Sequence, residues 1–292
     1  MQITREMKDD WCLWQDVATD QMVEARLQLH HAAQLVAAMG KYLLPERPDD
    51  SHTSLHWSSE FQALAGESVS EDGKLYGAIR PRDLTLLLID ETADTTQEFP
   101  LDKQPLQDGL SWLKETLSEK EIDTSTLSLK MHYDIPEHAV ADGAAFNSKH
   151  PEAFVEFARF YGNFNLLLQQ LSNETPEASA VICWPHHFDI ATLITLEAND
   201  NPEKKKTVGV GLSPGDGSYE LPYVYVSPWP GPDIKDADLP SLSSGGRWHT
   251  EGWFGAVLTS DQLVRGPEAD PQIQQIIDYI SSAVSEAKNL LS

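Results

Sequence analysis

The hydrophobic positions along the chain first follow a helical spacing. After Thr19 and up to Gly40, apolar residues recur at alternating three- and four-residue steps: Met22, Ala25, Leu29, Ala32, Val36 and Met39. This spacing places them in one continuous stripe and predicts a helix. Similar stripes predict three more helices, which begin near Pro105, Pro151 and Ile273.

Segments with alternating or continuous apolar positions lie between these helices. They read as strands, and turn residues such as Asp72-Gly73 and Pro81 separate them. The expected strands are 55–63, 75–79, 84–89, 96–99 and 127–131, followed by 178–184, 188–197, 207–212, 223–227 and 252–258. Groups of strands between flanking helices are typical of an α+β fold with mostly antiparallel sheets, each covered by helices on one face.

The order helix, strands, helix occurs twice along the chain. We therefore expect two similar halves, residues 1–145 and 146–292, packed as one compact unit, with a linker within residues 134–150. The alternative is that no duplication occurred, because many α+β chains can be divided into two such sets. Residues 227–246 contain four prolines and are expected to form a long loop, and long loops in compact folds are more often functional than not.

The charge of the chain excludes two classes of partner. Its 292 residues carry 21 Lys and Arg against 46 Asp and Glu, which gives a formal net charge of −25. Nucleic acids and anionic membrane surfaces repel such a chain, because binding to them depends on basic side chains that neutralise phosphates. We expect neither as a partner, and the sequence carries no signal for an oligomeric state.

The expected location is the cytoplasm. The chain has two cysteines, Cys12 and Cys183, and so has no disulfide framework. Its first residues lack the apolar segment of a signal peptide. The longest aliphatic run, residues 84–89, is far shorter than the ~20 residues that a membrane helix requires.

Two segments carry a resemblance to a known family. The first is Leu29-His30-His31-Ala32-Ala33-Gln34-Leu35-Val36, followed by residues 47–53 (Arg-Pro-Asp-Asp-Ser-His-Thr), and the second is Trp184-Pro185-His186-His187-Phe188-Asp189-Ile190-Ala191. Together they resemble an uncharacterised bacterial family that is catalogued as a domain of unknown function. The resemblance covers most of the chain in the right order and implies a cytoplasmic bacterial protein, but no activity.

Two pairs of imidazole and carboxylate groups are the candidate catalytic residues. If both segments are extended, His187 and Asp189 share one face of a strand, and so do His249 and Glu251. Four such groups from neighbouring strands suit a divalent transition metal, or act as general base and acid without one. The alternative is that these residues make only structural contacts, because the spacing matches no specific metal motif.

Aromatic residues around these pairs are the candidate ligand-binding wall. They are Trp184, His186, Tyr225, Trp248 and Trp253. Apolar walls with a few polar groups are typical of small-molecule sites, although aromatic residues in strands are also common in cores. No phosphate-binding loop, dinucleotide-binding glycine set or serine-nucleophile motif is present. The expected function is therefore a small-molecule binding protein or an enzyme, and the alternative is a non-catalytic structural or interaction protein.

Overall fold

The computed structural model describes residues 1–199, 201, 204–232 and 238–292. It contains helices and two antiparallel sheets, which confirms the α+β class. The described chain forms two compact units. The terminal unit consists of Met1–Asp16, Arg159–Val181 and Asp189–Ser292, and the central unit consists of Val17–Ala158 and Ile182–Phe188. The expected division of the chain at residue 145 stays a prediction.

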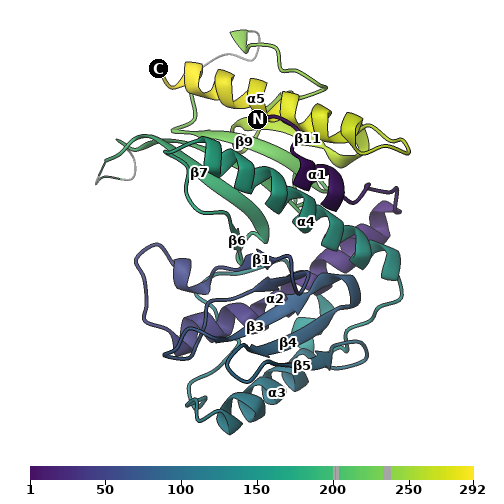
Figure 1. Cartoon of the computed structure of the whole chain (residues 1–292), viewed down its shortest axis with the longest axis vertical. Helices are drawn as coiled ribbons and strands as arrows, with labels where there is room; N and C mark the ends of the chain where they lie inside the picture. The colour runs from purple at the N-terminus through teal and green to yellow at the C-terminus, as the bar shows by residue number, and fades with distance from the viewer. Residues whose placement is uncertain (200, 202–203, 233–237) are drawn as a thin grey trace. The chain divides into compact units, whose positions relative to one another are not determined.

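The central unit is built on a sheet whose neighbouring strands follow one another along the chain. These strands are β1 (His56–Ser58), β2 (Ala63–Ala65), β3 (Leu75–Arg80), β4 (Thr85–Asp90) and β5 (Thr95–Pro100), all antiparallel. The helix α2 (Thr19–Leu43) packs against β3 and against α3 (Leu106–Glu119) (Figure 1). The strand β6 (Ile182–Trp184) also belongs to this unit, where Cys183 pairs with Leu55 in an antiparallel bridge.

The apolar stripe of α2 is buried as its spacing predicts. Met39 lies over Gly77 of β3, and Val36 lies over Gly66, directly after β2. On another side of the helix, Leu35 lies against Gly109 of α3. Because α2 has neighbours on several sides, its polar residues His30, His31 and Gln34 are buried as well, each 5 % exposed.

The terminal unit has a second antiparallel sheet in the order β10-β11-β9-β8-β7. The strands are β7 (Asp189–Glu197), β8 (Lys206–Ser213), β9 (Tyr223–Trp229), β10 (Arg247–His249) and β11 (Gly255–Thr259). The helices are α1 (Arg5–Asp10), α5 (Asp270–Leu290) and the part of α4 (Pro151–Glu174) that follows Ala158. α5 packs against β8 and β9, and Figure 1 shows it in yellow beside β9.

Several expected elements differ from the observed ones. Residues 55–63 form no single strand, because a turn in which Gln62 has φ 47° separates β1 from β2. Residues 127–131 are irregular, although Leu127 is buried. α1 was not expected. β9 extends to Trp229, so the expected loop 227–246 begins later, and its residues 233–237 lie outside the described residues.

The duplication is not confirmed. In the central unit the sheet order follows the chain order, whereas in the terminal unit β11 lies between β9 and β10. The duplication therefore stays a prediction. No helix in the described part of the chain is both long and apolar enough to cross a membrane.

Candidate functional site

His186 and His187 lie in a turn. β6 ends at Trp184, residues 185–188 turn, and β7 begins at Asp189. The backbone N–H of Phe188 donates to the carbonyl oxygen of Trp184 at 2.6 Å, and Phe188 has φ 59°. The expectation that His187 and Asp189 share one face of a strand is therefore wrong, because His187 precedes the strand that Asp189 begins.

Two buried side chains of α2 hold this turn. The carbonyl oxygen of Pro185 accepts hydrogen bonds from His30 Nε2 and from Gln34 Nε2, both at 2.9 Å. A carbonyl oxygen only accepts, so His30 carries its proton on Nε2. The His30 ring also stacks on Phe188, with centroids 5.1 Å apart and an angle of 7° between the planes. The left-handed backbone of Phe188 is thus fixed by contacts from a buried helix.

The segment that carries Tyr133 also contacts the Gln34 side chain of α2. The Tyr133 hydroxyl donates to Gln34 Oε1 at 2.9 Å, and Gln34 Nε2 also donates to the carbonyl oxygen of His30 at 3.1 Å. Both ends of the Gln34 amide are therefore engaged. Gln34 connects α2, the turn at Pro185 and the irregular segment that carries Tyr133.

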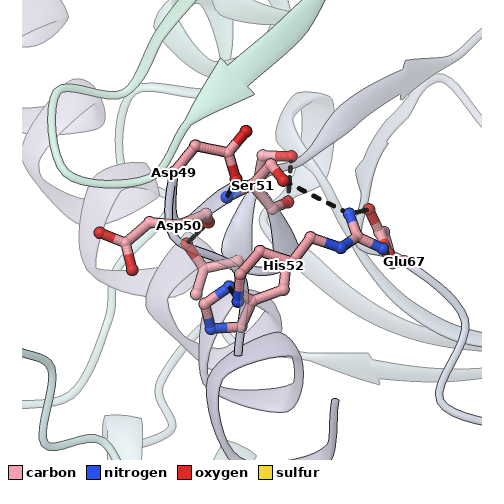
Figure 2. Close-up of polar contacts among 8 residues, drawn as sticks. Asp49, Asp50, Ser51, His52 and Glu67 are labelled. Carbon is pink, nitrogen blue, oxygen red and sulfur yellow. Dashed lines mark hydrogen bonds and ion pairs between the residues drawn. The ribbon is translucent and has the colours of Figure 1, made fainter. Parts of the chain in front are cut away.

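Hydrogen bonds of its own side chains hold the loop of residues 47–54 (Figure 2). Arg47 forms two parallel hydrogen bonds with the Glu67 carboxylate, at 2.5 and 2.6 Å. Asp49 Oδ1 accepts from the backbone N–H of Ser51 at 3.2 Å. Asp50 has φ 58°, and Figure 2 shows its carboxylate pointing away from Ser51 and Glu67. The loop thus holds the Asp50 carboxylate outside its own hydrogen-bond network.

The Asp50 carboxylate and several aromatic rings form one group. His132 Nε2 lies 3.1 Å from Asp50 Oδ2. The centroid of the His186 ring lies 5.6 Å from that of Tyr133, 5.8 Å from that of Trp184 and 4.4 Å from that of His187. We call Asp50, His132, Tyr133, His186 and His187 the imidazole cluster. It unites residues that are far apart in the sequence.

The environment keeps the His186 imidazole neutral at pH 7. Burial is the main cause that lowers the pKa of His186 from 6.5 to about 4; His187 and His132 act in the same direction, and the Asp50 carboxylate acts against them. Burial also raises the pKa of the Tyr133 phenol, with Asp50 and Cys183 adding to this effect. A neutral imidazole offers one donor and one acceptor. Among the described residues, no hydrogen-bond partner is found for the ring nitrogens of His186 or His187.

Six of the predicted site residues lie in the terminal unit: Asp189, Tyr225, Trp248, His249, Glu251 and Trp253. Tyr225 donates its hydroxyl hydrogen to Asp189 Oδ2. To reach β7, the Tyr225 side chain crosses β8 at Gly211. A Cβ atom there would lie 2.6 Å from Tyr225 Oη and 2.7 Å from the carbonyl oxygen of Ile190. Only glycine leaves space for this crossing.

The remaining tyrosines connect to His249 and Trp253. Tyr223 donates to Asp216 Oδ2 at 2.6 Å and stacks on Trp253, with centroids 6.2 Å apart. His249 in turn lies 4.4 Å from Trp253, centroid to centroid, and its Nδ1 is 3.0 Å from the Tyr219 hydroxyl. Burial, together with the hydrogen bond to Asp216, raises the pKa of the Tyr223 phenol. These polar groups have partners inside the chain.

The expected pairing of His249 with the Glu251 carboxylate is wrong. β10 ends at His249, so Glu251 lies beyond the strand and is exposed. His249 Nε2 donates instead to the backbone carbonyl oxygen of Glu251 at 2.7 Å. Trp248 has other neighbours: its Nε1 donates to the carbonyl oxygen of Pro240 at 2.8 Å, and its ring stacks on Phe254 with centroids 5.2 Å apart.

The predicted metal site gains no support from the structure. In the described part of the chain, no group of three or more His, Cys, Asp or Glu residues is arranged to hold a metal ion. His187 belongs to the central unit, whereas Asp189, His249 and Glu251 belong to the terminal unit. A shared catalytic or metal site of these four residues stays a prediction.

Gly211→Ala is expected to destabilise the protein by about 1–3 kcal/mol, because the added methyl group overlaps Tyr225 Oη and backbone atoms. Gly209→Ala on the same strand is the matched control, since a Cβ atom there has no neighbour closer than 3.8 Å among the described atoms. Urea unfolding of both variants measures the difference. Equal destabilisation by the two substitutions would contradict the close approach of Tyr225.

Sequence reasoning missed several members of the imidazole cluster and its supports. His30, Gln34 and Asp50 lie within the segments that carry the family resemblance, so a signal for them existed. His132 and Tyr133 lie in an irregular segment that was expected to be partly a strand. No periodicity marks such a segment, and its contacts depend on the tertiary fold.

Comparison of the chain with protein-family models, with curated proteins and with solved structures finds no match. The resemblance to the uncharacterised bacterial family therefore stays a prediction.

Proposed function

We propose that this chain binds a small molecule at the imidazole cluster. One observation carries the proposal: two turns with left-handed non-glycine residues, Asp50 and Phe188, present a carboxylate and two imidazoles to one another. The proposal keeps His186, His187 and Trp184 from the expected site and adds Asp50, His132 and Tyr133.

The backbone conformation of both turns is energetically unfavourable. A non-glycine residue in the left-handed region costs on the order of 1–3 kcal/mol and persists where the surrounding structure fixes it. The hydrogen bonds of the loop around Asp49 and Ser51 fix Asp50, and the contacts of His30 fix Phe188. Strain of this kind is concentrated at binding and catalytic sites. Two strained residues at one cluster support a functional role for this cluster.

The hydrogen bonding of the cluster supports binding over a purely structural role. His30 and Gln34 are buried and bonded to Pro185, as structural residues are. His186 is partly buried and His187 is exposed, and the described chain provides no hydrogen-bond partner for their ring nitrogens, so these nitrogens are accessible to a ligand. Imidazoles are also the usual general acids and bases near neutral pH. A bound substrate would therefore meet groups able to move a proton, which keeps an enzymatic role open to test.

The test is retention of small molecules from a metabolite extract, measured by equilibrium dialysis and mass spectrometry. We expect the protein to retain at least one compound, and His186→Ala and His187→Ala each to weaken its retention by about tenfold or more, which corresponds to about 1.4 kcal/mol. The control His150→Ala removes a partly exposed imidazole near Glu152 and is expected to bind normally. Unchanged retention in both cluster variants, with the fold intact, would refute the proposal.

A further inference from the structure

The Asp50 carboxylate is the acidic side chain that acts on the imidazole cluster. In the described part of the chain, the charged and titratable groups that shift the pKa of His186 are His187, Asp50 and His132. Asp50 is also the charged group that shifts the pKa of Tyr133. No lysine or arginine belongs to either set. Among these groups, the acidic side chain that a ligand meets is therefore Asp50.

We propose that the ligand of this cluster is a small organic cation, with an ammonium group that lies against the Asp50 carboxylate. This inference rests on the proposed function. The geometry behind it is the orientation of Asp50, whose carboxylate points away from the rest of the loop 47–54 (Figure 2). Its Oδ2 lies 3.1 Å from His132 Nε2. One carboxylate oxygen, Oδ2, lies near His132 Nε2, and the acceptor capacity of Oδ1 serves the ammonium group.

The aromatic rings of the site also suit a cation. The partly buried rings of Tyr133 and Trp184 flank His186, with centroids 5.6 and 5.8 Å from it. The faces of Trp and Tyr attract ammonium groups, by about 0.5–1 kcal/mol at exposed sites and ~2 kcal/mol when the cation is desolvated. A neutral imidazole accepts a hydrogen bond from an ammonium N–H, whereas a protonated one repels it. Carboxylate, imidazole and aromatic faces thus favour the same class of ligand.

The charge of the whole chain acts in the same direction. A formal net charge of −25 attracts cations over the distance that salt leaves unscreened, about 8 Å at physiological ionic strength. An anion would meet both this field and Asp50. It would find no basic side chain among the groups that act on His186.

The test uses a series with the same four methylene groups and different end groups: putrescine as cation, 1,4-butanediol as neutral compound and adipate as anion. Choline and its neutral isostere 3,3-dimethyl-1-butanol form a second pair. Binding is followed by NMR of the imidazole signals, which His186→Ala and His187→Ala assign. We expect at least one cation to shift the signals of His186 and His187, and the neutral and anionic compounds to leave them unchanged.

Asp50→Asn tests the contribution of this carboxylate to binding separately from the contribution of the net charge of the protein. Asn tolerates the left-handed backbone, so the loop keeps its conformation. We expect this substitution to weaken cation binding by at least about tenfold. The control Glu115→Gln on α3 makes the same change in net charge at an exposed position and is expected to bind normally.

The outcomes distinguish a wrong ligand class from a wrong proposed function. If neither cation shifts the imidazole signals, or if Asp50→Asn binds as well as the unaltered protein, the inference is overturned. If the compounds retained from a metabolite extract depend on His186 but are neutral or anionic, only the ligand class is wrong. If retention does not depend on the cluster histidines at all, the proposed function itself fails.

Discussion

Gly40→Ala is expected to destabilise the protein by about 3 kcal/mol, because the added methyl group meets backbone atoms. A Cβ atom at Gly40 would lie 2.1 Å from the carbonyl oxygen of His52 and 3.0 Å from Thr53 Cα. Backbone atoms cannot rotate away as a side chain can. The loop 47–54 would have to leave the end of α2, and Asp50 would move with it.

Gly109→Ala is the matched control for this substitution. It also places a methyl group in a helix, but the nearest atom, at 2.9 Å, is Cδ1 of the Leu35 side chain, which can adjust. Replacing glycine by alanine within a helix gains up to ~1 kcal/mol in helix propensity, and this gain applies to both variants. Urea unfolding is expected to show a much larger loss for Gly40→Ala. A loss no greater than that of Gly109→Ala would contradict the packing of the loop on α2.

The sequence predicted the elements whose spacing is regular over many residues. The stripe from Met22 to Met39 identified α2, and the apolar runs after Lys74 and after Leu84 identified β3 and β4. Such patterns predict helices and strands because the burial of one face requires apolar residues at the same spacing in most folds. Elements of three residues, such as β1 and β2, lie below the length at which alternation separates a strand from a turn.

The site was harder to predict because its geometry depends on turns. The segment from Trp184 to Asp189 was interpreted as extended, and its histidines were assigned to faces of a strand. Pro185 was the contrary signal, since proline lacks a backbone donor and is common in turns. Nothing local indicated that Asp50 would approach His132, because the two residues are 82 positions apart in the sequence and only the tertiary fold brings them together.

The hydrogen-bond partners in the terminal unit differ from the expected ones. His249 bonds to Tyr219 and to a backbone carbonyl, and Asp189 accepts from Tyr225. Tyrosine hydroxyl groups, which the sequence places only in the wall of the site, are the hydrogen-bond partners of Asp189 and His249. Residue spacing alone does not distinguish a carboxylate paired with an imidazole from one paired with a phenol two strands away.

Acidification from pH 6.5 to pH 4 is expected to cost the protein about 3 kcal/mol of stability through His30 alone. Burial is the main cause that lowers the pKa of His30 from 6.5 to about 4; His31, Arg26 and His187 act in the same direction, and the hydrogen bond to Pro185 acts against them. Between these two pH values the unfolded chain binds a proton at His30 that the folded chain does not. The stabilisation is therefore complete above pH 6.5 and is lost as the pH falls toward 4.

His30→Gln isolates this contribution, because it removes the titrating group and leaves the other acidic and basic groups in place. The variant is expected to be less stable than the unaltered protein at pH 7, since the bond to Pro185 and the stacking on Phe188 are weakened. Its loss of stability between pH 7 and pH 4 should nevertheless be smaller by about 3 kcal/mol, as measured by urea unfolding at each pH. His150→Gln, at a partly exposed histidine, should keep the full loss.

If His30→Gln loses as much stability on acidification as the unaltered protein, His30 titrates near its ordinary pKa, and the inference that it is a buried, neutral residue that holds the turn at Pro185 is wrong. The acid sensitivity would then arise from other groups.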